Sequence, residues 1–444
     1  MRALIVILGV SALLKLALLW PAADLPLRGD ERQYVAGAIA ISETGVPAYP
    51  NPVWDEAHSS PLYPYGLAAF HGIFGEERFL TWVRVAQILL SVLTTLLVYA
   101  VALRAFDRRN ALISAAIVSV FPTFVAYTHY LLTETVYTFL FVGLAAILLA
   151  PPRPTTPYRA LAAGVVGGLA ALARGAFVVQ APFVLLWLML PGGGSRRRRA
   201  VNAGAFLLGM AVAIGPWSVY STLRYDRFLL IDTNGGNVLY KNWNVIRQEN
   251  HDIGMDKRWR DDKLAYDGRI PFRERVEVEH IVERSGAETR AAVRFVLAHP
   301  LLFARNSVIR AAELVNPTSF LVRSIRRGDY AGLPALLGEA LIWAVLLGTM
   351  ALLGFGALGL AGRPPTVERM LPGLMILGNV AVCVLIVSMS RYRYPMMLLV
   401  VPFAVDGALR IRQSAGERTR GWWLSLSVVA LMMVAWMIYV PYSL

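Results

Sequence analysis

Two carboxylates stand side by side directly after the first apolar stretch of the chain. The sequence there reads Gly29-Asp30-Glu31-Arg32-Gln33-Tyr34, so Asp30 and Glu31 lie where the polypeptide leaves a predicted membrane helix. An ionised carboxylate beside a membrane is costly unless it is hydrated, paired or functional. One interpretation is structural, because Asp30 with Gln33 three residues later fits a capping box at a helix start. The other is that the acid pair carries out chemistry.

A further acid, Glu134, stands at the end of a later apolar run, in the sequence Thr133-Glu134. A carboxylate at that position is also favoured by the positive end of the helix dipole, which is a structural explanation. If Asp30 and Glu134 converge from different helices, they could act as a general base or hold a divalent metal ion. Spacing along the chain does not establish the convergence.

Four arginines fall in apolar surroundings or at helix junctions on the side of the predicted membrane where positive charge is disfavoured. Arg84 lies inside the second apolar run, Arg174 lies at a bend between two short runs, and Arg391 and Arg393 lie in Ser390-Arg391-Tyr392-Arg393-Tyr394. The structural interpretation is snorkelling at the membrane interface, with the tyrosines as an aromatic belt. The functional one is that guanidinium groups bind phosphate oxygens of a lipid-linked substrate.

The composition places the chain among membrane proteins. It has 444 residues, of which 57% are hydrophobic and 16% are charged, which is too apolar for an ordinary soluble protein. The formal net charge of +14 would suggest nucleic-acid binding in a soluble chain. Here the arginines gather in short loops between apolar runs, such as 196–199, which is the positive-inside pattern. The single cysteine, Cys383, excludes a disulfide framework.

The apolar runs predict an all-α bundle of about eleven transmembrane helices. The first run is interpreted as an uncleaved anchor, because Lys15 interrupts it. The loop charges place the amino terminus in the cytoplasm and the carboxyl terminus outside. The spans are expected near residues 3–20, 79–103, 111–127, 132–150, 160–174, 176–190, 200–221, 333–361, 370–388, 394–410 and 421–441.

Two long segments do not span the membrane in this interpretation, and both are extracytoplasmic. The first, residues 21–78, has helical spacing of apolar residues at 31–42, which is typical of an amphipathic helix on the membrane surface. The second is residues 222–332, with a helix-like stretch at 272–299. Three parts result: a transmembrane catalytic module at 1–221, the extracytoplasmic segment at 222–332, and carboxyl-terminal helices at 333–444.

The ordered set of motifs resembles the GT-C-fold glycosyltransferases that use polyprenyl-phosphate sugars, which include protein O-mannosyltransferases and lipid A aminoarabinose transferases. The set is the short first helix, Gly-Asp-Glu-x-x-Tyr, Ser60-Pro61-Leu62-Tyr63-Pro64, Thr133-Glu134, the Ala-Arg bend and Ser390-Arg391-Tyr392-Arg393. The likeness covers residues 1–220 well and the rest mainly in architecture. One departure is Ser59-Ser60-Pro61 where some relatives have Lys-Pro-Pro, which puts a lysine contact to the phosphate in doubt and leaves His58 as a candidate for the neighbouring role.

The resemblance implies roles for the residues singled out above. Asp30 would be the catalytic aspartate that accepts a proton from the acceptor hydroxyl or orients it, with Glu31 beside it. Glu134 would match the acid of the second outer loop, and Asp30 and Glu134 are the candidate ligands if a divalent metal takes part. The candidates for the donor phosphate are Arg84, Arg174, Arg391 and Arg393, and those for binding donor or acceptor are Tyr34, His58, Lys241, Asn242 and Trp243.

The implied function is transfer of a sugar, with inversion, from a polyprenyl-phosphate donor to a lipid, glycan or protein acceptor. The implied location is the inner membrane of a bacterium, with the site facing the periplasm or the cell exterior. Two alternatives stay open: a transporter or flippase of a lipid-linked or anionic solute, and an O-antigen ligase or polymerase. The segments 234–237 and 240–244 could bind sugar through amides and aromatic stacking, or could simply form turns with an interfacial tryptophan.

Overall fold

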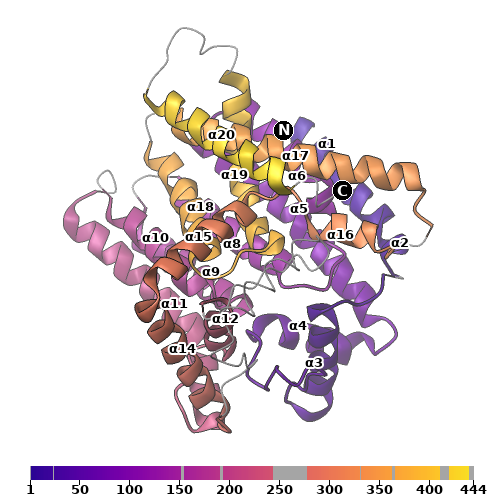
Figure 1. Cartoon of the computed structure of the whole chain (residues 1–444), viewed down its shortest axis with the longest axis vertical. Coiled ribbons are helices and arrows are strands. Elements are labelled where there is room, and N and C mark those ends of the chain that lie inside the picture. The colour runs from indigo at the N-terminus through magenta and orange to yellow at the C-terminus, as the bar shows by residue number, and fades with distance from the viewer. Residues whose placement is uncertain are drawn as a thin grey trace.

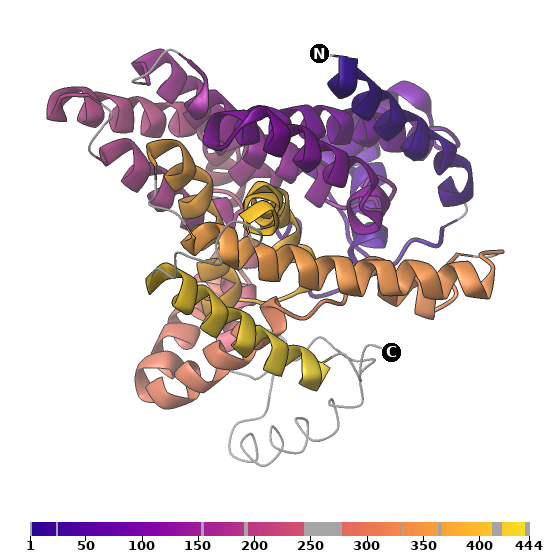
Figure 2. The same cartoon turned by 90° about the horizontal axis from the view of Figure 1, so that it is seen from above.

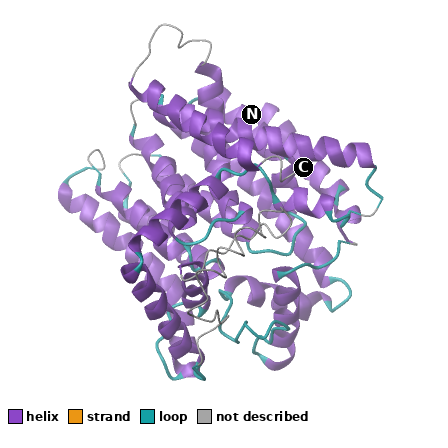
Figure 3. Ribbon diagram, viewed as in Figure 1, coloured by secondary structure: helices purple, strands orange, loops and turns teal. Residues whose placement is uncertain are grey.

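The computed structural model describes residues 2–23, 25–151, 155–190, 194–243, 278–330, 332–362, 366–410 and 420–439. This part of the chain consists of α-helices joined by loops (Figure 3). In chain order the helices are α1 (Arg2–Ala17), α2 (Leu19–Ala23), α3 (Asp30–Thr44), α4 (Leu62–Phe74), α5 (Phe79–Ala105), α6 (Arg108–Val120), α7 (Pro122–Ala126), α8 (Glu134–Leu149), α9 (Pro157–Ala173), α10 (Phe177–Met189), α11 (Arg196–Tyr225), α12 (Asn234–Trp243), α14 (Ile281–Ala298), α15 (Pro300–Leu314), α16 (Phe320–Arg326), α17 (Ala335–Ala361), α18 (Val367–Leu385), α19 (Ser390–Arg410) and α20 (Arg420–Tyr439).

In the described part of the chain, four helices are long and apolar enough to cross a membrane: α5, α11, α17 and α18. Helices α8, α9 and α10 are also apolar but shorter. Each of these seven helices begins and ends within about four residues of the limits of a predicted apolar run. Two predicted runs, 3–20 and 111–127, are each divided between two helices. The run 111–127 becomes α6 and α7, because Pro122 has no N–H to continue the first helix. The chain is therefore an all-α polytopic membrane protein, as predicted, while the number of eleven spans stays a prediction.

Close helix crossings hold the bundle together. Helix α9 packs along α11, and α17 packs against α19 and lies beside α20 in both views (Figure 1, Figure 2). A methyl group built on Gly164 would overlap the carbonyl of Phe206, and one built on Gly209 would overlap the carbonyl of Leu161. These two glycines allow the backbones of α9 and α11 to touch, as small residues do in membrane helix pairs.

The crossing gives a testable expectation for stability. Gly209→Leu should lower the thermal unfolding midpoint in detergent, because its side chain would push α11 away from α9. The matched control is Gly204→Leu on the same helix, where an added Cβ has open space around it. An equal loss of stability in both variants would show that the α9–α11 crossing is not the cause.

The two long segments meet at one end of the molecule, where α3 and α4 lie near α12 and α14 (Figure 1). The backbone N–H of Thr233 donates to the carbonyl of Ala57 over 2.9 Å, and its hydroxyl donates to Asp55 Oδ1 over 2.7 Å. Arg284 forms an ion pair with Asp55 at 3.3 Å. These contacts dock the second segment on the first and enclose the space between them and the bundle. The predicted helix at 272–299 appears as α14 from Ile281, and residues 272–277 lie outside the described part.

Candidate functional site

Four charged side chains from four separate elements form a line of alternating charge. Asp30 is the first residue of α3, Arg391 the second residue of α19, Glu134 the first residue of α8, and Arg174 follows α9. Arg391 Nη1 lies 2.5 Å from Asp30 Oδ2, and Arg391 Nε lies 3.7 Å from Glu134 Oε1. Arg174 Nη1 donates to Glu134 Oε1 over 3.0 Å. The convergence that the sequence could not establish is therefore present in the fold.

Burial differs sharply along this line. The side chain of Glu134 is 1% exposed and that of Arg174 is 9% exposed, whereas Arg391 is 18% and Asp30 is 27% exposed. A carboxylate as deeply buried as Glu134 needs its cationic partners, and the amino end of α8 supplies a further favourable field. The guanidinium of Arg174 also lies over the ring of Tyr392, 4.4 Å from its centroid. Glu134 thus anchors the arginines, while Asp30 is the accessible end of the line.

Asp30 does not cap its own helix. The residue before α3 is Gly29, whose φ of 50° is a conformation that favours glycine, and this position forms no side-chain capping bond. Gln33 accepts a hydrogen bond from the N–H of Asn51 instead. The capping-box interpretation of Asp30 and Gln33 is therefore wrong. The Asp30 carboxylate forms an ion pair with Arg391 and does not cap α3.

Glu31, rather than Asp30, is the acid that binds backbone N–H groups at the start of α3. It is buried, and its carboxylate accepts from the backbone N–H groups of Arg28, over 3.1 Å, and Leu131, over 2.9 Å. Burial raises the pKa of Glu31, and the two backbone hydrogen bonds oppose this. The side chain ties the start of α3 to the loop before α8, so it positions Asp30 and does not line the cavity.

A cavity with two chambers opens beside Asp30. The first chamber has a volume of about 340 Å³ and apolar walls that include Val178, Val179 and Ile386, so we name it the apolar chamber. The second has a volume of about 400 Å³ and a lining rich in arginine and asparagine, and we name it the polar chamber. Residues shared by both linings mark the junction between the chambers: Asp30, Trp54, His58, Asn234, Val238, Val387, Arg391 and Tyr392.

The comparisons with known proteins agree with this architecture. A family profile described as dolichyl-phosphate-mannose-protein mannosyltransferase matches residues 57–220. A search of curated proteins finds no match. The apo oligosaccharyltransferase of Archaeoglobus fulgidus is similar in structure, with a TM-score of 0.53 and 14% identity over 100% of this chain and 55% of that chain. The chain has the GT-C fold.

Two further structures match the chain at a similar sequence identity. The AglB oligosaccharyltransferase of Archaeoglobus fulgidus, in complex with an inhibitory peptide and a dolichol-phosphate, has a TM-score of 0.50 and 15% identity over 99% of this chain and 55% of that chain. ArnT from Cupriavidus metallidurans bound to undecaprenyl phosphate has a TM-score of 0.43 and 15% identity over 92% of this chain and 80% of that chain. The chain spans about half the length of the oligosaccharyltransferases that it matches.

Within this GT-C fold, most of the predicted binding residues lie at the cavity. Tyr34, His58 and Arg174 line the apolar chamber, and Lys241 and Asn242 line the polar one. His58 stacks on Trp54, with ring centroids 4.5 Å apart, and together they give the junction a flat face.

Besides the acids Glu31 and Glu134, three predicted residues line neither chamber. Trp243 donates through its indole N–H to the carbonyl of Leu385. Arg84 is buried and donates to the carbonyl of His129 over 3.1 Å. Arg393 is buried as well, and its guanidinium donates to three carbonyls at and after the end of α15: Leu314, Asn316 and Thr318. Each of these side chains therefore fixes backbone in the structure.

The pair predicted to hold a metal, Asp30 and Glu134, faces a guanidinium. Among the described residues, no group of three or more His, Cys, Asp or Glu side chains is placed to hold a metal ion. Arg391 stands between the two carboxylates and contacts both. This arrangement does not fit a divalent ion bound between them, so the chemistry below is derived from side chains alone.

Asp232 is a cavity residue that the sequence analysis missed. It lines the apolar chamber from the loop before α12, where Ser60 Oγ donates to its Oδ2 over 2.5 Å and the N–H of Asn234 donates to its Oδ1 over 3.1 Å. Ser60 Oγ in turn accepts from the N–H of Gly175, next to Arg174. The only sequence signal was an acid following the apolar residues 229–231 in a long segment.

The burial of Asp232 predicts that the stability of the protein depends on pH. Burial raises the pKa of Asp232 from 3.8 to about 6. Because the folded state holds this proton more tightly than the unfolded state, stability falls as pH rises from about 4 and the loss is complete above about pH 6. Asp232→Asn mimics the protonated acid, so its unfolding midpoint should gain on wild type between pH 4.5 and pH 7.5. Differential scanning fluorimetry in detergent measures this; a difference that is constant with pH would contradict it.

Proposed function

We propose that this chain is an integral membrane glycosyltransferase that moves a sugar from a polyprenyl-phosphate donor to an acceptor on the extracytoplasmic side. The observation that carries the proposal is the position of Asp30. Its carboxylate is free of helix capping, lies at the junction of an apolar and a polar chamber, and is held by Arg391. The family profile and the solved relatives, whose names include a mannosyltransferase and dolichol-phosphate and undecaprenyl-phosphate complexes, support the same class of donor.

The donor would occupy the apolar chamber. Val178 and Val179 at the start of α10, with Ile386 after α18, give walls suited to isoprenyl units. The donor phosphate would then lie near Arg174 and Arg391 at the inner end of that chamber. Arg391 uses Nη1 for Asp30 and directs Nε toward Glu134, and a guanidinium has five N–H donors in all. Its remaining donors suit phosphate oxygens.

The reaction would be a single displacement at the anomeric carbon. Asp30 accepts the proton of the acceptor hydroxyl as the hydroxyl oxygen bonds to the anomeric carbon. The bond from that carbon to the phosphate oxygen breaks at the same time, and the departing polyprenyl phosphate takes the electron pair. Arg391 and Arg174 stabilise the phosphate charge. Attack from the side opposite the leaving group inverts the anomeric centre.

The distribution of charge supports a location. The arginine-rich short loops favour the cytoplasm for one side of the bundle, which would put the two long segments beside the cavity on the other side. We therefore place the protein in the inner membrane of a bacterium, with the cavity open to the periplasm or the cell exterior. The acceptor is then a lipid, glycan or protein of the envelope.

The proposal is tested by comparing the envelope of a deletion strain with that of the parent by mass spectrometry. A glycosyltransferase predicts the loss of one sugar mass from a defined lipid, glycan or protein, and the loss identifies donor and acceptor together. Purified chain in liposomes should also form that product from a polyprenyl-phosphate sugar. Movement of a lipid-linked solute across the vesicle membrane without a glycosidic product would contradict the proposal and favour a transporter.

A further inference from the structure

The two chambers differ in charge. Asp30 and Arg391 belong to both linings and offset each other. Apart from this pair, the apolar chamber has one cation and one acid, Arg174 and Asp232. Among the described residues of its lining, the polar chamber has no further acid and four further cations: Arg28, Lys241, Arg323 and Arg327. The excess of positive charge is therefore confined to the polar chamber.

Among the described residues, the three further arginines of this chamber outnumber the acids that pair with them. Asp329, which is 4% exposed, pairs with both Arg28 at 2.9 Å and Arg327 at 3.3 Å. One carboxylate thus forms ion pairs with two guanidiniums. Arg323 donates to a neutral partner, the hydroxyl of Ser390, over 3.1 Å. In the described part of the chain, three guanidiniums therefore lie with one carboxylate at the wall formed by α16 and the loops beside it.

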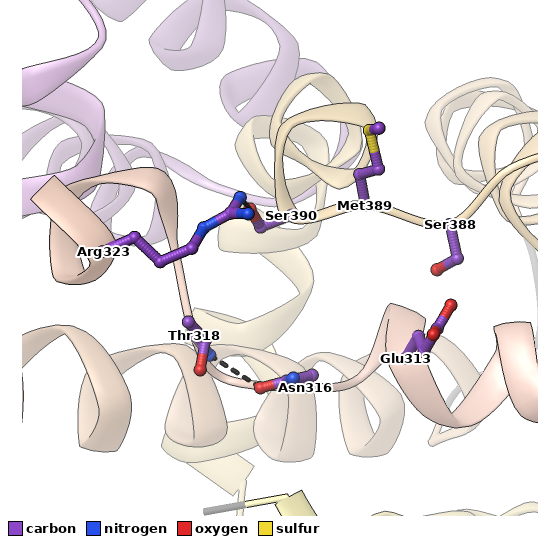
Figure 4. Close-up of a pocket in the computed structure, with 7 residues that line it drawn as sticks. All are labelled: Glu313, Asn316, Thr318, Arg323, Ser388, Met389 and Ser390. Atoms are coloured by element: carbon purple, nitrogen blue, oxygen red, sulfur yellow. Dashed lines mark hydrogen bonds between the residues drawn. The ribbon is translucent and has the colours of Figure 1, made fainter. Parts of the chain in front are cut away.

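Helix α16 and the residue that follows it present two cations beside one aromatic ring. The guanidiniums of Arg323 and Arg327 lie 5.7 and 5.8 Å from the ring centroid of Phe320, which also lines the polar chamber. Figure 4 shows the Arg323 side chain reaching from α16 to the segment 388–390. A small cavity of about 30 Å³ lies behind this contact, enough for about one water molecule. Arg323 is therefore anchored beside the residue that precedes Arg391.

The position of these cations calls for an anionic partner. They lie on the side of the protein where loop charges disfavour arginine and lysine, and they line a cavity rather than a lipid-facing surface. The donor phosphate does not account for them, because the apolar walls that suit a polyprenyl chain belong to the other chamber. A wall with several guanidiniums binds phosphate or carboxylate groups through charge-assisted hydrogen bonds.

We infer that the polar chamber binds the acceptor and that the acceptor is an anion, carrying a phosphate or carboxylate group close to the hydroxyl that is glycosylated. The inference rests on the proposed function and adds the chemical class of its second substrate. The anionic group lies against Arg323 and Arg327, and the hydroxyl then reaches Asp30 at the junction. The donor sugar approaches the same junction from the apolar chamber.

The first test uses fractionated acceptor. A detergent extract of the envelope of the deletion strain is separated by anion exchange at neutral pH into unretained and retained pools. Each pool is incubated with wild-type protein in liposomes and a polyprenyl-phosphate sugar carrying a radiolabel. Label should enter the retained, anionic pool. Label entering only the unretained pool would overturn the inference and leave the proposed function intact, whereas label entering neither pool would contradict the proposed function itself.

The second test uses matched arginines on α16 and directly after it. Arg323→Gln and Arg327→Gln should each raise the KM for the anionic acceptor about 10- to 100-fold, with the KM for the donor changed less than about twofold. The control is Arg326→Gln, because Arg326 pairs with Glu339 at 2.7 Å and does not line the chamber. Arg323→Lys keeps the charge and should recover part of the affinity. A rise in the KM for the donor instead would overturn the inference.

Discussion

Asp30→Asn is expected to reduce sugar transfer by about 100- to 10,000-fold while leaving the protein folded and in the membrane. The amide keeps the size of the side chain but cannot accept the proton of the acceptor hydroxyl. The fold should survive for two reasons. Asp30 is 27% exposed and does not cap α3, and Arg391 retains Glu134 as a counter-ion at 3.7 Å. Transfer from a polyprenyl-phosphate sugar in liposomes measures the loss, and size-exclusion chromatography in detergent reports the fold.

The same helix supplies the control for this experiment. Glu43 lies near the end of α3, is exposed and is distant from the cavity linings, so Glu43→Gln should transfer sugar at the wild-type rate. Asp30→Glu keeps the charge but moves the carboxylate outward by one methylene group. Since a misplacement of about 1 Å can lower a catalytic rate about 100-fold, this variant should also transfer sugar slowly. Near-normal transfer by Asp30→Asn would contradict the proposed role of Asp30 and would favour the ligase and polymerase alternatives.

The helices could be predicted because apolar length is a local property of the sequence. The runs at 79–103 and 333–361 correspond to α5 and α17. Local chemistry was less reliable at the site. The pattern Asp-x-x-Gln indicated a cap at Asp30, yet the neighbouring Glu31 took the backbone hydrogen bonds. Either residue satisfies a local rule, and only the docking of α3 against the loop before α8 decides between them.

The composition of the site depended on contacts between distant parts of the chain. Asp30 and Arg391 are separated by almost the whole sequence and lie 2.5 Å apart in the fold. An arginine in an apolar run looks the same in the sequence whether it binds a ligand or backbone carbonyls, which is why Arg393 was grouped with Arg391. Asp232 was missed because its position facing the cavity depends on Ser60 and Gly175, which belong to other segments.

Glu134→Gln is expected to lower the free energy of unfolding by about 3–5 kcal/mol as well as to impair transfer. The physical reason is that Glu134 is the only carboxylate, among the described residues, that pairs with Arg174, and it is 1% exposed. Its neutralisation leaves the buried Arg174 without a counter-ion and leaves Arg391 with Asp30 alone. The effect on stability should separate this variant from Asp30→Asn, which is expected to lose activity with little change in stability.

A double variant distinguishes the loss of charge balance from a simple packing defect. In Glu134→Gln/Arg174→Gln the unpaired cation is removed as well, so the unfolding midpoint should recover toward wild type while transfer stays low, because Arg174 is also a proposed phosphate contact. Thermal unfolding in detergent and the liposome transfer assay, applied to the wild type, both single variants and the double variant, give the coupling between the two residues. Additive losses of stability would mean that Glu134 and Arg174 act independently, and the description of Glu134 as the anchor of the arginines would then have to be abandoned.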